Sequence, residues 1–145
     1  MYQSKKHFEG AANKTKKLGR KQILCVDGYR ENRDVITLIL VQNNYEVTTA
    51  HTPQDALRLA KSRQFDLYIL DSWLPEGSEY ELCKQIRKID AHTPLLFYSP
   101  ISPTSNMQEA LAAGAQGYLQ KPSYPKKLIQ IITDLINNAE AQRTK

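Results

Sequence analysis

Four polar side chains come at the ends of short apolar runs, and together they could hold a divalent cation and a phosphoryl group. Asp27 and Asp71 end two of these runs, and Ser99 and Lys121 end two later ones. Carboxylate oxygens are ligands that Mg²⁺ prefers, and a lysine ammonium can stabilise charge on phosphoryl oxygens. In open parallel α/β sheets, ligands bind just beyond the carboxyl ends of the strands. We therefore interpret these four residues as one candidate site, provided that the runs are parallel strands.

The run before Asp71, Leu67 to Leu70, is too short for an ordinary helix and too apolar for a half-exposed strand. It predicts a strand buried on both faces, which is typical of parallel sheets. The other predicted strands are 22–27, 45–50, 94–98 and 117–120. Helical spacing of apolar residues and proline or glycine boundaries predict helices over about 30–42, 53–63, 82–89, 107–113 and 128–136.

The alternation of five strands with five helices indicates an α/β fold with a parallel sheet, right-handed crossovers and helices on both faces. In the first helix, the expected core stripe is Val35, Leu38 and Ile39, broadened by Ile36, Leu40 and Val41. Cys25 and Cys83 lie inside apolar patterns and outside any CxxC or Cys/His cluster. We expect both to be buried, reduced thiols.

The length of 145 residues, with 41% hydrophobic and 24% charged residues, fits one globular domain. We expect a basic, disordered tail over 1–21, the folded domain over 22–138 and a polar tail over 139–145. No apolar run approaches the roughly 20 residues that span a bilayer, and the N-terminal stretch lacks the apolar centre of a signal peptide. We expect a cytoplasmic protein without a membrane partner.

The net charge of +5 resides in the first 21 residues, which hold seven Lys or Arg against Glu9, whereas residues 22–145 carry a net charge of −1. One interpretation of this tail is a solubilising leader. The other is weak electrostatic contact with nucleic acid or an acidic partner. The chain has no base-reading motif, so we do not expect nucleic acid to be its main partner.

The order of the strand-end residues resembles the receiver domain of two-component response regulators, of the chemotaxis single-domain type, over residues 22 to about 138. The residues that carry the resemblance are Asp27, the segment Leu70-Asp71-Ser72-Trp73-Leu74-Pro75, Ser99, and Lys121-Pro122 with Tyr118 three positions earlier. The resemblance implies a doubly wound, flavodoxin-like (βα)5 fold with strand order 2-1-3-4-5. It implies a signalling domain with no attached output domain, and not an enzyme.

Carried over position by position, the resemblance makes Asp71 the phosphoacceptor, with Ser99 and Lys121 assisting the transfer. Ser99 and Tyr118 become the switch pair. Mg²⁺ is assigned to Asp27, Asp71 and Trp73. The implied partners are a histidine kinase or phosphotransfer protein and a downstream protein target.

The sequence departs from the family pattern at two positions. Receivers usually have two adjacent acids after the first strand, but here Gly28 follows Asp27 and offers no side-chain ligand. We therefore expect weak Mg²⁺ binding, with Glu31 as a candidate substitute ligand. Pro100 replaces a commonly small residue after Ser99 and stiffens a segment that is expected to move.

Three alternatives to a phosphorylated switch follow from the same residues. Taken singly, Asp27 and Asp71 could cap helices, Ser99 could form a turn and Tyr118 could pack as an ordinary aromatic. As a group, they could belong to a pseudo-receiver that binds partners without phosphorylation. A phosphatase of similar topology would need a DxD motif, which Asp71-Ser72-Trp73 lacks.

Overall fold

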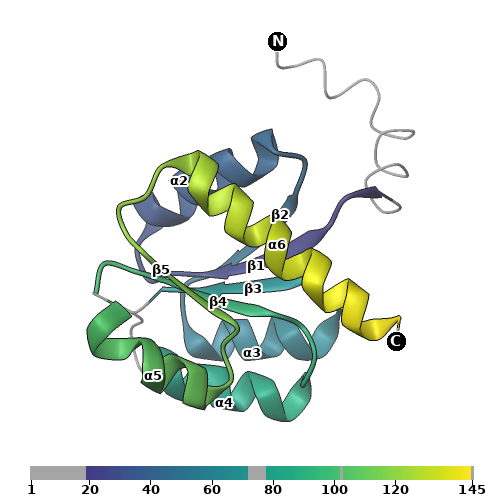
Figure 1. Cartoon of the computed structure of the whole chain (residues 1–145), viewed down its shortest axis with the longest axis vertical. Helices are drawn as coiled ribbons and strands as arrows, with labels where there is room; N and C mark the ends of the chain where they lie inside the picture. The colour runs from purple at the N-terminus through teal and green to yellow at the C-terminus, as the bar shows by residue number, and fades with distance from the viewer. Residues whose placement is uncertain (1–18, 72–77, 102, 145) are drawn as a thin grey trace.

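The computed structural model describes residues 19–71, 78–101 and 103–144. Five parallel strands form one sheet in the order β2-β1-β3-β4-β5 (Figure 1). The strands are β1 (Gln22–Val26), β2 (Glu46–Ala50), β3 (Leu67–Leu70), β4 (Leu95–Ser99) and β5 (Gly117–Gln120). The helices are α2 (Arg30–Gln42), α3 (Pro53–Ser62), α4 (Glu79–Ile89), α5 (Pro103–Ala113) and α6 (Pro125–Arg143). This confirms the predicted α/β class, the flavodoxin-like fold and the strand order.

Helices cover both faces of the sheet, with α2 and α6 on one face and α3, α4 and α5 on the other (Figure 1). Strand β3 shows why its sequence is apolar at every position. Leu67 and Ile69 pack into the core beneath α2 and α6, while Tyr68 and Leu70 pack into the opposite core. Burying a large apolar side chain contributes about 1.5–3 kcal/mol, so both layers hold this central strand in place.

Local sequence signals fix where several of these helices begin and end. The Thr52 hydroxyl accepts a hydrogen bond from the Asp55 amide at 3.1 Å, and Ser78 caps α4 in the same way through the Glu81 amide at 3.0 Å. After α5, Gly114 has φ +113, and a Cβ there would lie 2.8 Å from Arg87 Cγ. Glycine therefore suits this turn both conformationally and sterically.

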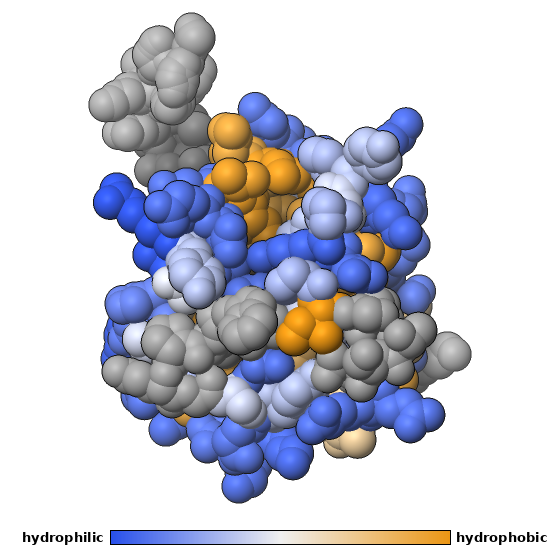
Figure 2. Space-filling model, turned by 90° about the vertical axis from the view of Figure 1, so that its left-hand side faces the viewer, coloured by the Kyte–Doolittle hydropathy of each residue, from blue (hydrophilic) through white to orange (hydrophobic). Residues whose placement is uncertain are grey.

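The predicted core stripe of α2 is wrong in three of its positions. Val35 and Leu38 are each 59% exposed and Val41 is 47% exposed, whereas Ile36 and Leu40 are buried. Because α2 is apolar around much of its circumference, spacing alone does not select one face; packing against β1 and β3 does. Figure 2 shows a hydrophobic patch on the upper part of the face that includes α2.

The last helix is longer than its apolar repeat predicts. Leu128, Ile132 and Ile136 form its buried stripe, but α6 continues to Arg143. An ion pair between Lys21 and Glu140 joins this extension to the start of β1. Residues 139–143 are thus polar and helical, and the domain limits given above stay predictions. Within the described residues, no helix is both long and apolar enough to cross a membrane.

Both cysteines are free and buried, as the sequence predicts. Cys25 lies in β1 and Cys83 in α4. Burial is the main cause that raises the pKa of both thiols, in the case of Cys83 to about 11. Both side chains therefore remain protonated at neutral pH and serve as small core residues.

Candidate functional site

Parallel pairing brings four strand ends to one rim of the sheet. Backbone hydrogen bonds extend the ladder by one residue past three of the strands: the Asp27 amide donates to Ala50 O at 3.0 Å and the Asp71 amide to Val26 O at 2.9 Å. The Lys121 amide likewise donates to Ser99 O at 2.7 Å. The sheet itself therefore places the predicted site residues beside one another.

The centre of the site is the ammonium of Lys121, which contacts two carboxylates. Its Nζ lies 3.2 Å from Asp71 Oδ1 and 3.3 Å from Asp27 Oδ2. Asp71 and Asp27 are only 3% and 5% exposed. Burial favours the uncharged lysine, but the two carboxylates outweigh it and raise the pKa of Lys121 above its ordinary value. Lys121 is therefore a permanent cation shared between two acids.

The second oxygen of Asp27 is held by the start of α2. Asp27 Oδ1 accepts hydrogen bonds from the Tyr29 amide at 2.9 Å and from Asn32 Nδ2 at 3.3 Å. Arg33 donates to the carbonyl oxygen of Asp27 at 2.9 Å. These contacts orient Oδ2 toward Lys121. Asn32 and Arg33 were not predicted as site residues, because their helical positions carry no strand-end signal.

The donor set fits Mg²⁺ only weakly. Asp27 and Asp71 supply hard carboxylate oxygens, but Gly28 supplies no side-chain oxygen and Glu31 is exposed on α2. Among the described residues, no group of three or more His, Cys, Asp and Glu side chains could hold a metal ion. Asp27 and Asp71 are thus the described residues that would hold Mg²⁺. Trp73 and Pro75 lie outside the described part of the chain.

The two predicted switch residues both bind the backbone of Ile101, two residues after the end of β4. The Ser99 hydroxyl, fully buried, accepts a hydrogen bond from the Ile101 amide at 3.0 Å. The Tyr118 hydroxyl donates to the Ile101 carbonyl oxygen at 2.9 Å. Both residues thus form hydrogen bonds with the same backbone segment. This segment includes Pro100, which stands where receivers commonly have a small residue. Ser99 and Tyr118 each bind a main-chain atom of Ile101, and their switching role stays a prediction.

Two further side chains complete the surroundings of the site. Lys121 Nζ lies 5.0 Å from the ring centroid of Tyr98, a cation–π contact, and the Tyr98 hydroxyl is 3.1 Å from the Ser123 hydroxyl.

Glu79, at the start of α4, is only 7% exposed. Burial is the main cause that raises its pKa, followed among the raising causes by the charge of Asp71. Sequence reasoning missed both residues, because Tyr98 reads as strand core and Glu79 as a favourable acid in a first helical turn.

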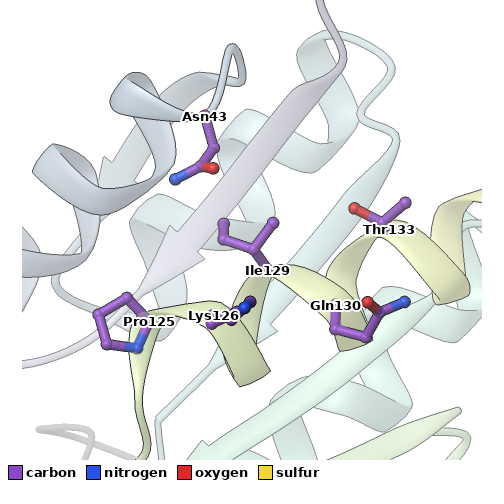
Figure 3. A pocket seen from close by; sticks show the side chains of 6 residues that line it. All are labelled: Asn43, Pro125, Lys126, Ile129, Gln130 and Thr133. Carbon is purple, nitrogen blue, oxygen red and sulfur yellow. The ribbon is translucent and has the colours of Figure 1, made fainter.

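Two hollows lie near α6. A groove of about 670 Å³ follows the edge strand β5, and Tyr118, Lys121, Tyr124 and Lys127 are among its lining residues. A second hollow of about 380 Å³ lies between the end of α2 and the first turns of α6, where Asn43 and Ile129 point toward each other (Figure 3). Of these two hollows, the groove along β5 is lined by the predicted site residues Tyr118 and Lys121, whereas no predicted site residue in the described part of the chain lines the second.

Comparisons with known proteins agree with this geometry. Residues 23–133 match the family described as the response regulator receiver domain. A curated relative, the probable transcriptional regulator ycf27 of Cyanophora paradoxa, is 28% identical over 123 residues, which are 85% of this chain and 51% of the relative. The response regulator ArlR of Staphylococcus aureus is 33% identical over 115 residues, which are 79% of this chain and 52% of the relative. This chain thus spans about half the length of the curated relatives that it matches.

Solved structures give the same result. A CheY-like receiver domain protein of Methanospirillum hungatei has a TM-score of 0.81 and 27% identity, covering 86% of this chain and 99% of that one. The receiver domain of a sensor histidine kinase of Pseudomonas aeruginosa has a TM-score of 0.76 and 26% identity, covering 82% and 99%; it was solved with magnesium in its active-site cleft. The fold, the strand-end residues and the matched span lead to one conclusion: this chain belongs to the response regulator receiver domain family of two-component signalling.

Proposed function

We propose that Asp71 accepts a phosphoryl group from a histidine kinase or a phosphotransfer protein, and that the adduct changes which proteins bind this domain. The observation that supports this most is the position of Lys121, whose ammonium contacts both buried carboxylates at 3.2 and 3.3 Å. A carboxylate, a second acid and a fixed cation then lie at one rim, as phosphoryl transfer requires.

The transfer proceeds as an in-line displacement. A carboxylate oxygen of Asp71 attacks the phosphorus of a phosphohistidine, the P–N bond breaks, and its electron pair returns to the imidazole nitrogen. Lys121 turns from the Asp71 carboxylate to the incoming phosphoryl oxygens and neutralises part of their charge. Asp27, held by Tyr29 and Asn32, keeps its second oxygen directed at the same space. Bound Mg²⁺ would supply further neutralisation of charge there.

The signal is then carried by Ser99 and Tyr118. A phosphoryl oxygen on Asp71 would accept a hydrogen bond from the Ser99 hydroxyl, whose oxygen accepts from the Ile101 amide in the resting arrangement, so rotation of this side chain toward the phosphoryl group would move the Ile101 backbone. Movement of this backbone segment shifts the Ile101 carbonyl oxygen, which accepts the hydrogen bond from the Tyr118 hydroxyl. The affected surface is the face of α5, β5 and α6, where the groove along β5 offers a binding site for a downstream protein.

A pseudo-receiver is the second candidate function, and two observations favour it. Gly28 removes an acid from the site, and Pro100 stiffens the segment after Ser99 that a switch would have to move. In that case the same α5, β5 and α6 face binds its partner whether or not a phosphoryl donor is present.

Reductive trapping tests the proposal. The protein is incubated with Mg²⁺ and a small-molecule phosphodonor and then treated with borohydride, which converts an aspartyl phosphate to homoserine. Peptide fragmentation should place the homoserine at position 71. Homoserine at position 27 or 66 would contradict the assignment, and unchanged peptides at every aspartate would favour the pseudo-receiver.

A further inference from the structure

Three aromatic rings form a continuous column beside the switch. Tyr80 of α4 stacks on Phe97 of β4, with ring centroids 5.2 Å apart and planes inclined by 27°. Phe97 also stacks on its cross-strand partner Tyr118 of β5, with ring centroids 6.1 Å apart and planes inclined by 17°. Both distances fall within the range of favourable offset stacking. The column therefore connects the helix that follows Asp71 in the chain with the predicted switch aromatic.

The middle ring of this column cannot move independently of its neighbours. Phe97 is fully buried, and strand alternation places it on the same face of the sheet as Ser99. Tyr80 and Tyr118 are half-buried and pack against the same core cluster. The orientation of Phe97 thus depends on the ring of Tyr80, and the surface offered to Tyr118 depends on Phe97.

Tyr118 is fixed at two points in the resting arrangement. Its hydroxyl donates to the Ile101 carbonyl oxygen at 2.9 Å, and its ring rests on Phe97. The first contact is with the backbone segment that Ser99 also holds. The second belongs to the aromatic column. If phosphorylation loosens the hydrogen bond to Ile101, the aromatic column is what still holds Tyr118 against the core.

We propose that Tyr80 is a positioning residue for the switch: its ring, acting through Phe97, holds Tyr118 against the core and sets how readily Tyr118 moves outward. This inference rests on the switch role of Tyr118 proposed above. A stacked aromatic pair gives roughly a threefold to tenfold preference for the stacked arrangement. Loss of the Tyr80 ring should therefore raise the ratio of outward to inward Tyr118 by up to about the same factor.

The electrostatic surroundings of Tyr80 agree with this role. Burial is the main cause that raises the pKa of Tyr80 to about 12, and the next causes are Glu79, Tyr118 and Glu109. The Tyr80 phenol is thus neutral at physiological pH and lies close enough to Tyr118 to be influenced by it. Because the ring and not the hydroxyl makes the stacking contact, a phenylalanine at position 80 should hold Tyr118 as well as the tyrosine does.

The test measures the exposure of the Tyr118 ring in the full chain without a phosphodonor. Tyrosine rings are labelled with carbon-13, and the Tyr118 signal is identified by its loss in Tyr118→Phe. A soluble gadolinium chelate then broadens each signal in proportion to its exposure. In Tyr80→Leu, or in Tyr80→Met if the leucine variant does not fold, the Tyr118 signal should broaden more than in the parent. In Tyr80→Phe it should match the parent.

The matched control is Phe65→Leu, which removes one ring of a different aromatic pair. Phe65 is buried, and its ring forms a tilted pair with that of Tyr68, with centroids 5.9 Å apart and planes inclined by 55°, before the start of β3 and remote from the site. This variant should lower the melting temperature without changing the Tyr118 signal. Equal broadening of Tyr118 in Tyr80→Leu and the parent would overturn the inference, as would equal increases in Tyr80→Leu and Phe65→Leu.

The outcome is separable from that of the proposed function. If the parent forms no adduct with a phosphodonor, phosphoryl acceptance fails, yet the resting comparison still shows whether Tyr80 positions Tyr118. If the parent does form the adduct, the Tyr118 signal should shift on phosphorylation. The shift should be smaller in Tyr80→Leu, because its Tyr118 already occupies the outward position more often. A shift as large as that of the parent would count against the positioning role.

Discussion

The ammonium of Lys121 lies 3.2 Å from Asp71 Oδ1, so the cation and the proposed phosphoacceptor are already paired in the resting protein. Asp27 shares the same ammonium at 3.3 Å. Because Gly28 leaves only two carboxylates in contact with Lys121 among the described residues, the single charge of Lys121 offsets a large part of the negative charge of the site without a metal. The pairing also sets the resting stability of the site, which can be measured independently of phosphorylation.

Removal of the cation should destabilise the protein in a pH-dependent way. Lys121→Met leaves Asp27 and Asp71 buried without their shared partner, which should cost about 2–4 kcal/mol of unfolding free energy at pH 7. As the pH falls, one carboxylate can take up a proton, so the deficit relative to the parent should shrink toward pH 5. Urea unfolding at several pH values measures this deficit. A deficit that is constant from pH 5 to 8 would contradict the account, and Lys126→Met, an exposed lysine of α6, is the control.

Restoring the missing acid should strengthen Mg²⁺ binding. Gly28→Asp adds a hard oxygen beside Asp27 and Asp71, and the metal then gains a ligand. Without metal, the same substitution crowds three acids around Lys121 and should lower the melting temperature. The fluorescence of Trp73, the only tryptophan, follows the titration. Superimposable Mg²⁺ titrations of the parent and Gly28→Asp would refute the prediction.

A substitution at Glu31 tests whether this exposed residue is a Mg²⁺ ligand. If Glu31 replaced the missing acid, Glu31→Gln would weaken Mg²⁺ binding as strongly as loss of a ligand. Because Glu31 is exposed on α2, we expect Glu31→Gln to bind Mg²⁺ as the parent does. A clear loss of affinity would restore Glu31 as a ligand.

The Asp90 carboxylate should contribute stability that acid removes. It accepts hydrogen bonds from the Tyr68 hydroxyl at 2.9 Å and from the amides of Thr93 and His92 at 3.0 and 3.1 Å. Burial would raise its pKa, but the interaction with the Thr93 side chain, together with these bonds, holds the pKa below its ordinary value of 3.8. Because the pKa of Asp90 is lower in the folded than in the unfolded protein, its ionised form stabilises the fold. This stabilisation is present above the pKa of the unfolded state and is lost as the pH falls through the pKa of the folded state.

Asp90→Asn should therefore lower the unfolding free energy by about 1–3 kcal/mol near neutral pH, and the difference should diminish below about pH 4. Chemical unfolding at pH 7, 5 and 3 measures it. Asp134→Asn, an exposed acid of α6, is the control and should remain close to the parent at each pH. A difference that grows as the pH falls would show that the sign is wrong.

A phosphorylated Asp71 should lose its phosphoryl group slowly. Ile101, two residues after Ser99, is a bulky apolar side chain that cannot orient a water for attack. Its backbone is held by Ser99 and Tyr118 through main-chain atoms, so Ile101→Asn keeps these hydrogen bonds while changing the side chain. The decay of the adduct after removal of the phosphodonor should be about threefold to tenfold faster in Ile101→Asn. Identical decay rates would leave Ile101 without this shielding role.

The fold was predictable from the sequence because each strand carries its own signal. The apolar run before Asp71, the capping residues Thr52 and Ser78, and the glycine at position 114 act locally and agree with one another. The exposed stripe of α2 was not predictable, because the apolar residues of its second half surround much of the helix and do not reveal which side meets the sheet. The end of α6 was also missed, because its last turns carry no large apolar residue that continues the helical repeat.

The sequence indicated which strand-end residues lie close together, but not which residues reach them from helices. Asp27, Asp71 and Lys121 meet because parallel strands end at one rim. Asn32 and Glu79 arrive from α2 and α4 at positions where polar residues are ordinary, so their types carry no signal. The ring column of Tyr80, Phe97 and Tyr118 joins three elements far apart in the chain, and spacing in the sequence does not reveal such a contact.

Intact mass spectrometry tests phosphoryl acceptance most directly. The parent, Asp71→Asn and the control Asp66→Asn are incubated with Mg²⁺ and a small-molecule phosphodonor and measured at short times. The parent and Asp66→Asn should gain about 80 Da, the mass of one phosphoryl group, and Asp71→Asn should gain nothing. An adduct of the same size on Asp71→Asn, or no adduct on the parent at any Mg²⁺ concentration, would contradict the assignment of Asp71 as the phosphoacceptor.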